Sequence, residues 1–383
     1  MGCGAGRGGA TSQLLLTLIV ISAIVAADAA TFKCSSAGTC WSLIDYVSPN
    51  TTTLEHIKTL FGVKNLRNIL GVNGLSVSTA RNYTVVANQT IRIPFRCVCA
   101  NGTGRSNHLP MYTVQKDDGL YHIAAEVFGG VVTYQEIAAA NNITDFNKID
   151  VGQLLWIPMP CSCDSVNGSA AVHYGHVVEV GSSVSEIATK YGADQQTILQ
   201  LNGIDDPKSL KAGEVLDVPL EACTSAVSND SLDYPLLVSN GTYTFTANNC
   251  VMCKCDAANN RTLQCESSGL KPSINSTWST CPTTQCQGNL FLGNTSSGSD
   301  CDQTMCAYAG YNTKTILSKL VSESSCPASK FKYATLIYFF VWYVWFYLYL
   351  FLHIECFMLA LAEILNAFVL FVYPLVHAQL CAV

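Results

Sequence analysis

The hydrophobic and polar positions of the chain return three times to one short pattern. It is an alternating apolar segment that contains proline and is followed within a few residues by cysteine: TIRIPFRCVC (90–99), LLWIPMPCSC (154–163) and VLDVPLEAC (215–223). Alternation at a period of two predicts a half-buried strand. Proline has no N–H to donate to a ladder, so we expect it to end each strand. The pattern therefore predicts three closing strands with cysteines behind them.

An internal repeat underlies this pattern. Residues 133–158 align with residues 194–219 at a constant offset of 61, and Leu120 aligns with Val184 at an offset of 64. The difference of three residues falls around VFGGVV, between two expected helices. Self-similarity at a fixed spacing indicates a repeated structural unit.

The last copy has the clearest local pattern. Ser183 and Glu186 have the spacing of a capping box ahead of an apolar helical face, as do Thr133 and Glu136 in the middle copy. Asn202-Gly203 is typical of a helix end. The expected elements of the last copy are a strand (176–180), a helix (183–192), a second helix capped by Asp194 (194–203) and a strand (215–219).

The first copy is more divergent. Residues 52–61 predict a helix with Thr52 and Glu55 as a capping box, and residues 65–74 predict a second helix that ends in Asn73-Gly74. The unit is thus strand–helix–helix–strand, roughly 45 to 50 residues long, and occurs three times. The fold class that follows is α+β, with three small βααβ domains.

The N-terminal segment has the pattern of a secretory signal peptide over residues 1–29. Arg7 precedes the apolar run Leu14–Val25, and Ala27-Asp28-Ala29 fits the small-residue cleavage rule. N-myristoylation is the competing interpretation of MGCGAG, but it requires Ser or Thr where Gly6 stands. We therefore expect a secreted protein.

Cysteines are numerous enough to stabilise such small units. Of the nineteen, sixteen remain when Cys3, Cys356 and Cys381 are set aside, an even number suited to disulfides. Cys34, Cys40 and the two C-x-C pairs, at 97–99 and 161–163, make six, which allow fifteen pairings. Zinc binding is the competing use of C-x-C pairs, and an oxidising compartment favours disulfides.

Glycosylation signals and charge agree with an extracellular location. The chain has 21 basic and 27 acidic residues without a basic cluster, which gives no sign of nucleic-acid binding. It has eleven N-x-S/T sequons, all between the apolar ends. They begin at Asn50, Asn82, Asn88, Asn101, Asn142, Asn167, Asn229, Asn240, Asn260, Asn275 and Asn294.

Several of these segments identify a family. YTVQKDDGLYHIAAEVFG (112–129), IAAANNITD (137–145) and GQLLWIPMPCSC (152–163) resemble LysM domains of plant receptors. NNCVMCKCDAANN (248–260) and CAYAGYN (306–312) resemble the cysteine-rich region of plant LysM domain-containing GPI-anchored proteins. The resemblance covers about residues 30–327 of the chain and implies a pattern-recognition receptor of plant innate immunity, without a cofactor.

The resemblance also implies an organisation and a disulfide pattern. The implied pairs are Cys34–Cys99, Cys40–Cys163 and Cys97–Cys161. The expected segments are a signal peptide (1–29), a degenerate LysM domain (34–96), two further LysM domains (110–160 and 174–220), a disulfide-rich module (223–326) and a hydrophobic tail (333–383). The implied partners are N-acetylglucosamine oligomers of chitin or peptidoglycan, and a LysM receptor-like kinase that signals for a chain without a kinase of its own.

In the LysM family the sugar lies in a groove between two loops, which here are residues 115–121 and 142–148 of the middle copy. Apolar side chains would contact the acetamide methyl group, and backbone amides would bind its polar atoms. The expected ligand-binding residues are Asp117, Asp118, Gly119, Tyr121, Ile143, Thr144, Asp145 and Phe146. The equivalents in the last copy, 181–183 and 204–206, are a second choice.

Each of these residues also has a purely structural interpretation. The two aspartates suit the N-terminus of a helix, where the dipole stabilises negative charge, and Ile143 suits the small core. The sequon at Asn142 places a glycan acceptor inside the expected groove. The sequence leaves these alternatives open.

Two other functions compete with a receptor. A hydrolase that uses the repeats as anchors would need paired carboxylates, and after the repeats only Glu266 and Asp300 are evident candidates. A wall-binding scaffold or decoy without a signalling partner has the same sequence pattern as a receptor. We expect a non-catalytic protein.

The C-terminal tail departs from the family pattern. A GPI signal has a polar spacer of about 8–12 residues and an apolar tail of about 10–20. Here only PASKFK separates Cys326 from an apolar segment (333–383), with Ala328 or Ser329 as the attachment site. Residues 333–352 are long enough to span a bilayer, and translation of an unspliced stretch is a further explanation. We expect membrane attachment at the cell surface, through a GPI anchor or a transmembrane segment.

Overall fold

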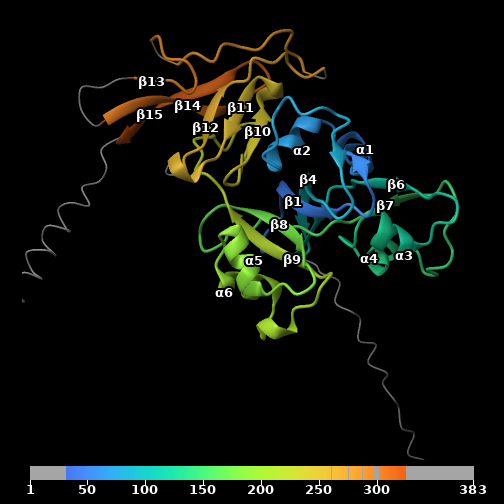
Figure 1. The fold of residues 1–383 in the computed structure, drawn as a ribbon. Helices are drawn as coiled ribbons and strands as arrows, with labels where there is room; N and C mark the ends of the chain where they lie inside the picture. The colour runs from blue at the N-terminus through green and yellow to red at the C-terminus, as the bar shows by residue number, and fades with distance from the viewer. Residues whose placement is uncertain (1–31, 260, 275, 287, 297–301, 325–383) are drawn as a thin grey trace, which may run out of the picture. The chain divides into compact units, whose positions relative to one another are not determined.

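The computed structural model describes residues 32–324, with gaps at 260, 275, 287 and 297–301 (Figure 1). The predicted signal peptide, the hydrophobic tail and the sequons at Asn260 and Asn275 lie outside the described residues. None of the described helices has both the length and the apolar composition needed to cross a membrane.

By its contacts the chain divides into two compact units. The larger includes the described residues up to Asn294 and residues 306–319. The smaller is described at 295–296, 302–305 and 320–324, where β13 (Thr295–Ser296) pairs antiparallel with the start of β14 (Asp302–Tyr311).

The first repeat has two short helices between long strands. Its elements are β1 (Gly38–Val47), β2 (Thr52–Thr53), α1 (Leu54–Leu60), α2 (Leu66–Val72), β3 (Thr84–Val85) and β4 (Thr90–Ala100), followed by β5 (Thr103–Ser106). The capping box predicted from Thr52 is wrong. Thr53 caps α1 by accepting a hydrogen bond from the N–H of His56, and Glu55 pairs with Lys58 instead.

The middle repeat keeps the expected order of elements. They are β6 (Met111–Thr113), α3 (Leu120–His122), the π-helical turn η1 (Ile123–Val127), α4 (Tyr134–Ala140) and β7 (Leu154–Trp156). The capping box of Thr133 and Glu136 is confirmed, with both reciprocal hydrogen bonds present. A π-turn accommodates an extra residue in the first helix.

The third repeat comprises β8 (Ala171–Val177), α5 (Val184–Tyr191), α6 (Gln195–Asn202), the 3-10 turn η2 (Pro207–Ser209) and β9 (Val215–Glu221). The capping box of Ser183 and Glu186 is confirmed, and so is the Asp194 cap. The first strand starts at Ala171 rather than at 176, because it pairs along its length with β9.

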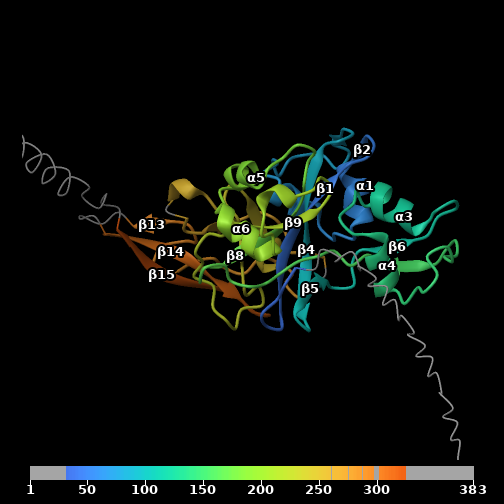
Figure 2. The same cartoon turned by 90° about the horizontal axis from the view of Figure 1, so that it is seen from below.

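One sheet combines the strands of the first and third repeats. Its order is β5-β4-β1-β8-β9, with β1 and β8 parallel, and Figures 1 and 2 show these strands side by side. The prediction that proline ends each strand is wrong for β4 and β9, which continue beyond Pro94 and Pro219. Strand β9 is an edge strand, and β5 pairs with β4 only from Cys97 onward. At each proline, one side of the strand has no neighbouring strand, so the missing N–H on that side costs no ladder hydrogen bond.

An asparagine at the end of the second helix fixes each repeat. In the third repeat, Asn202 donates to the carbonyl oxygens of Ile198 and Asp217 and accepts from the N–H of Asp217. The same three hydrogen bonds join Asn141 to Ile137 and Trp156, and join Asn73 to Ile69 and Arg92. We call this arrangement the asparagine clasp. It binds the helix to the closing strand in all three repeats, including the divergent first one.

The first and middle repeats share one hydrophobic core, and the third has its own. Phe61 and Phe128 meet edge to face, with ring centroids 5.5 Å apart, where the first two repeats adjoin. Small cores of this size bury limited apolar area and are commonly stabilised by disulfides.

The structure has the three disulfides that the resemblance implies: Cys34–Cys99, Cys40–Cys163 and Cys97–Cys161. The sulfur atoms of Cys40, Cys97 and Cys163 lie within 4.8 Å of one another. Each is bonded to another sulfur rather than free as a thiolate, so this cluster does not fit the zinc alternative.

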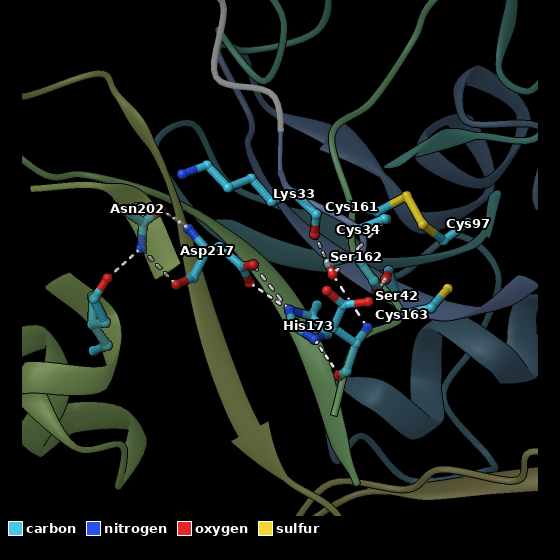
Figure 3. Close-up of polar contacts among 12 residues, drawn as sticks. Lys33, Cys34, Ser42, Cys97, Cys161, Ser162, Cys163, His173, Asn202 and Asp217 are labelled. Carbon is cyan, nitrogen blue, oxygen red and sulfur yellow. Dashed lines mark hydrogen bonds and ion pairs between the residues drawn. A yellow bond between two sulfur atoms is a disulfide. The ribbon is translucent and has the colours of Figure 1, made fainter. Parts of the chain in front are cut away.

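The second C-x-C pair and the residue after it connect all three repeats (Figure 3). Ser162 donates to the carbonyl of Lys33 (2.8 Å), and its own carbonyl accepts from Ser42. His173 on β8 contacts the carboxylate of Asp217 through Nδ1 (2.9 Å) and the carbonyl of Asp164 through Nε2 (2.8 Å). Both ring nitrogens therefore face acceptors, which suits the doubly protonated imidazolium.

The cysteine-rich module after the repeats contains a three-stranded sheet. Its strands are β10 (Tyr243–Thr246), β11 (Val251–Lys254) and β12 (Gln264–Ser267), with 3-10 turns η3 (Ala247–Asn249) and η4 (Ala257–Asn259) between them; β15 (Ile316–Ser324) follows β14. Its disulfides are Cys223–Cys255, Cys250–Cys281, Cys253–Cys265 and Cys286–Cys306. Cys301 and Cys326 lie outside the described residues.

Candidate functional site

The two loops expected to form a groove both lie at one end of the helices of the middle repeat. The first loop joins β6 to α3, and the second follows α4. Tyr121 is 68% exposed and Phe146 is 45% exposed. Because aromatic surface is normally buried, exposed rings in two neighbouring loops suggest a contact surface.

A third aromatic ring, Tyr134 on α4, lies between these two. Its ring centroid is 6.4 Å from that of Tyr121 and 5.4 Å from that of Phe146, and both contacts are edge to face. We call these three residues the aromatic row. The sequence predicted its two ends but missed Tyr134. The signal was available, because Tyr134 follows the N-cap Thr133 directly and so begins the helix beside the loops.

The structure assigns Asp118 to the scaffold. Its side chain is only 3% exposed and accepts hydrogen bonds from the N–H of Gln115 (2.6 Å) and the hydroxyl of Tyr112 (2.9 Å). It also pairs with Nδ1 of His122 at 2.9 Å. Burial, together with the hydrogen bond and charge of Asp118, raises the pKa of Tyr112 to about 12. Asp118 thus joins the first loop to β6 and α3 through side-chain contacts.

The other residues predicted in the first loop are open to solvent. Asp117 is exposed and has a left-handed backbone, with φ of +69°. Gly119 is the N-cap of α3, and no heavy atom of another residue lies within 4 Å of the position that a Cβ would take. The first loop therefore presents backbone at Gly119 and a carboxylate at Asp117 beside Tyr121.

The second loop offers backbone donors. Ile143 is half-buried against the core, and its N–H is bound to the carbonyl of Ala138. In the described part of the chain, the N–H groups of Thr144, Asp145 and Phe146 have no acceptor. Three consecutive free donors next to exposed aromatic rings can bind a carbonyl group such as that of an acetamide.

Charge contributes little to this site. Asp145 and Lys148 form an ion pair at 3.3 Å, but their side chains are 45% and 82% exposed. Exposed pairs of this kind contribute at most about 1 kcal/mol. Asn142, the sequon position, is exposed with φ of +57° at the edge of the second loop. The arrangement suits a neutral ligand with an apolar face and polar substituents.

The aromatic row occurs in one repeat. Under the alignment of the repeats, Tyr121, Tyr134 and Phe146 correspond to Ser185, Gln195 and Pro207 in the third repeat. In the first repeat, the asparagine clasp aligns Tyr134 and Phe146 with Leu66 and Ser78, and the helix N-caps Gly119 and Thr53 align Tyr121 with Glu55. The second-choice loops, 181–183 and 204–206, have a similar backbone without these rings. The middle repeat is therefore the stronger candidate.

Comparison with known proteins agrees with the repeat structure. The LysM domain family model matches residues 112–158 and 176–219, which are the middle and third repeats. The first repeat, which has the same clasp, is not among the matched ranges.

The chain is also similar to complete proteins. It is 50% identical over 319 residues to LysM domain-containing GPI-anchored protein 2 of Arabidopsis thaliana, covering 82% of this chain and 88% of the relative. It is 46% identical over 308 residues to the chitin elicitor-binding protein of Oryza sativa, covering 79% and 83%. A more distant relative is the chitin elicitor receptor kinase 1 of Physcomitrium patens, which is 24% identical over 195 residues, 50% of this chain and 29% of the kinase.

Proposed function

The chain belongs to the LysM domain-containing GPI-anchored proteins, and we propose that it is a non-catalytic receptor for N-acetylglucosamine oligomers at the plant cell surface. The observation that carries this proposal is the aromatic row of the middle repeat beside three free backbone donors. N-Acetylglucosamine has an apolar ring face and an acetamide. The rings suit the first, and the N–H groups of Thr144, Asp145 and Phe146 suit the second.

The proposed ligand-binding residues are those that the structure leaves accessible. They are Asp117, Gly119, Tyr121, Thr144, Asp145 and Phe146, together with Tyr134 and the half-buried Ile143. Asp118 supports the first loop and is assigned no ligand contact.

Chitin is the first choice of ligand. The rice relative is named for binding a chitin elicitor, and its identity to this chain covers 79% of the chain. Peptidoglycan also contains N-acetylglucosamine and is the second ligand to be tested. A single shallow groove buries little area against the cost of association, so we expect weak binding per site. Affinity then rises with oligomer length, because a longer oligosaccharide can bind several receptor molecules at once.

Signalling in innate immunity is proposed to require a partner. The moss relative combines a region similar to this chain with a kinase, which makes a LysM receptor-like kinase the proposed partner. Attachment at the outer face of the plasma membrane, through a GPI anchor as named for the Arabidopsis relative, is part of the same proposal.

The carboxylates considered for a hydrolase support a non-catalytic role. Glu266 on β12 forms an exposed ion pair with Lys254 at 3.1 Å, where both side chains are 54% exposed. Asp300 lies outside the described residues. Glu266 lies in the cysteine-rich module and not in the loops of the proposed groove.

The test is calorimetric titration of the purified chain with N-acetylglucosamine oligomers of increasing length and with peptidoglycan fragments. We expect affinity to rise with chitin oligomer length, and to collapse in a variant with both I143A and F146A. The matched control is I204A in the third repeat, which aligns with Ile143. Binding that survives in the double variant would remove the middle repeat from the proposal. No binding of any oligomer would refute the receptor function.

A further inference from the structure

A cleft of about 350 Å³ lies in the larger unit, and its walls share no residue with the proposed groove. The first repeat contributes β1, α2 and β4, the third contributes Val172 of β8, and the cysteine-rich module contributes β10 and η3. Cavities of 300–1,000 Å³ are typical of small-molecule sites, especially where several domains adjoin.

Trp41 and Arg96 form one wall. They are directly opposite each other on the antiparallel strands β1 and β4, and the guanidinium lies over the indole at 5.1 Å from its centroid. Trp41 is 38% exposed, and Arg96 is exposed too. No carboxylate of the described residues pairs with Arg96. The wall thus combines an accessible aromatic ring with an uncompensated positive charge.

Polar side chains without partners lie on the other walls. Asn68 on α2 and Asn248 in η3 both line the cleft, and within the described residues neither side chain has a hydrogen bond. Ala247, Asn248 and Asn249 all have positive φ, at 47°, 56° and 75°. Three consecutive non-glycine residues in this region are costly, and such backbone strain is concentrated at binding sites.

The walls are firmly joined. Asn65 of the first repeat donates to the side chain of Asn249 at 3.0 Å, and the hydroxyl of Tyr243 donates to the carbonyl of Leu75 at 2.5 Å. At Gly71 a Cβ would stand only 2.0 Å from the carbonyl oxygen of Tyr243, so only glycine permits this approach. The cleft is therefore pre-formed, as ligand sites usually are.

The carboxylate in the cleft already has hydrogen-bond donors. Asp233 lines the cleft, and its carboxylate accepts hydrogen bonds from the hydroxyls of Ser231, Thr246 and Tyr308. Arg96 has no such partner, so the side of the cleft near Trp41 favours an anion.

We propose that this cleft binds an acidic sugar, a uronic acid residue of an extracellular polysaccharide. The carboxylate pairs with the guanidinium of Arg96, and the apolar face of the ring lies against the exposed part of Trp41. The amides of Asn68 and Asn248 hydrogen-bond the ring hydroxyls. The site is separate from the acetamide groove, so it would give the receptor a second, charge-selective contact with a wall glycan.

The experiment titrates the full chain with a galacturonic acid trimer and with its methyl ester, which keeps the shape of the sugar and removes the charge. The variants are R96Q and W41A, and R81Q replaces an exposed arginine of the same repeat outside the cleft. We expect the acid to bind, the ester to bind at least about tenfold more weakly, and R96Q to lose at least about tenfold in affinity, because a charged hydrogen bond is lost. R81Q should bind as the unmodified chain does.

Titration of the same proteins with N-acetylglucosamine oligomers keeps the two proposals distinguishable. R96Q should leave that binding unchanged, which also shows that the variant is folded. The inference is overturned if the acid does not bind, if acid and ester bind equally, or if neither R96Q nor W41A weakens the acid. Each of these outcomes can occur while the acetamide groove still binds its own ligand.

Discussion

Replacing Asn202 by alanine should destabilise the third repeat far more than its position at a helix end suggests. Asn202 makes three hydrogen bonds, at 2.7, 2.8 and 2.9 Å, that join the end of α6 to Asp217 in the middle of β9. No other side chain of α6 bonds to the backbone of β9 among the described residues. The substitution therefore leaves the N–H of Asp217 without its acceptor.

The size of this destabilisation follows from the number of hydrogen bonds that are lost. A buried intramolecular hydrogen bond contributes about 0.5–1.5 kcal/mol net, and a donor left unsatisfied costs about 1–3 kcal/mol. Alanine returns a few tenths of a kcal/mol in helix propensity. We expect N202A to lower the free energy of unfolding by about 2–4 kcal/mol. N73A and N141A should have effects of similar size, because the same three bonds recur.

Guanidinium denaturation measures the loss of stability. Hydrogen exchange at the Asp217 amide shows whether the loss occurs at the contact between α6 and β9. The matched control is Q200A, which removes an exposed amide side chain from the same helix. Q200A should change the free energy of unfolding by less than about 0.5 kcal/mol. If N202A behaves like Q200A, or if exchange at Asp217 is not accelerated, the clasp does not hold the repeat together.

Three other predictions concern charge, binding and covalent structure. Burial opposes the charged form of His173, but the carboxylate of Asp217 and the carbonyl of Asp164 outweigh it and raise the pKa of His173 above 6.5. The stabilisation by protonated His173 should be fully present below pH 6.5 and lost as the pH rises through the raised pKa. H173Q should abolish this pH-dependent loss of stability in the pH profile of unfolding. Y134A should weaken binding of N-acetylglucosamine oligomers at least about tenfold in calorimetry without lowering the melting temperature by more than a few degrees, because the ring links both loops; an unchanged affinity would exclude Tyr134 from the site. With Cys34–Cys99 and Cys97–Cys161 intact, the Cys40–Cys163 disulfide closes a loop of only about 13 residues in the unfolded chain, so C40S with C163S should cost about 3 kcal/mol in chemical denaturation. A cost below about 1 kcal/mol would contradict its role.

The sequence predicted the repeated unit well because its information is local. The capping boxes at Thr133 and Ser183 and the ends of the second helices depend on residues within a few positions of each other. Where the pattern was less distinct, the prediction was wrong by one residue, as at Thr53. The prediction that proline ends each strand failed for β4 and β9, because whether proline is tolerated depends on the neighbouring strand, which a single segment does not reveal.

The aromatic row was predicted in part for the same reason. Tyr121 and Phe146 lie in the two loops that the family resemblance implied, and both are exposed. Tyr134 was missed because its contacts with them, at 6.4 and 5.4 Å, depend on how the helix and loops fold together. Asp118 was given a binding role although its carboxylate is buried by hydrogen bonds within its own loop. The merged sheet of the first and third repeats has no local signal, since β1 and β8 are far apart in sequence.

Hydrogen-exchange mapping of the full chain, with and without a long N-acetylglucosamine oligomer, locates the groove directly. We expect slower exchange in residues 115–121 and 142–148. The amides of Thr144, Asp145 and Phe146 should be among those protected, because they have no acceptor among the described residues of the free chain. The corresponding loops of the third repeat, 181–183 and 204–206, should be unaffected. Protection in the third repeat, or none in either, would contradict the assignment of the groove to the middle repeat.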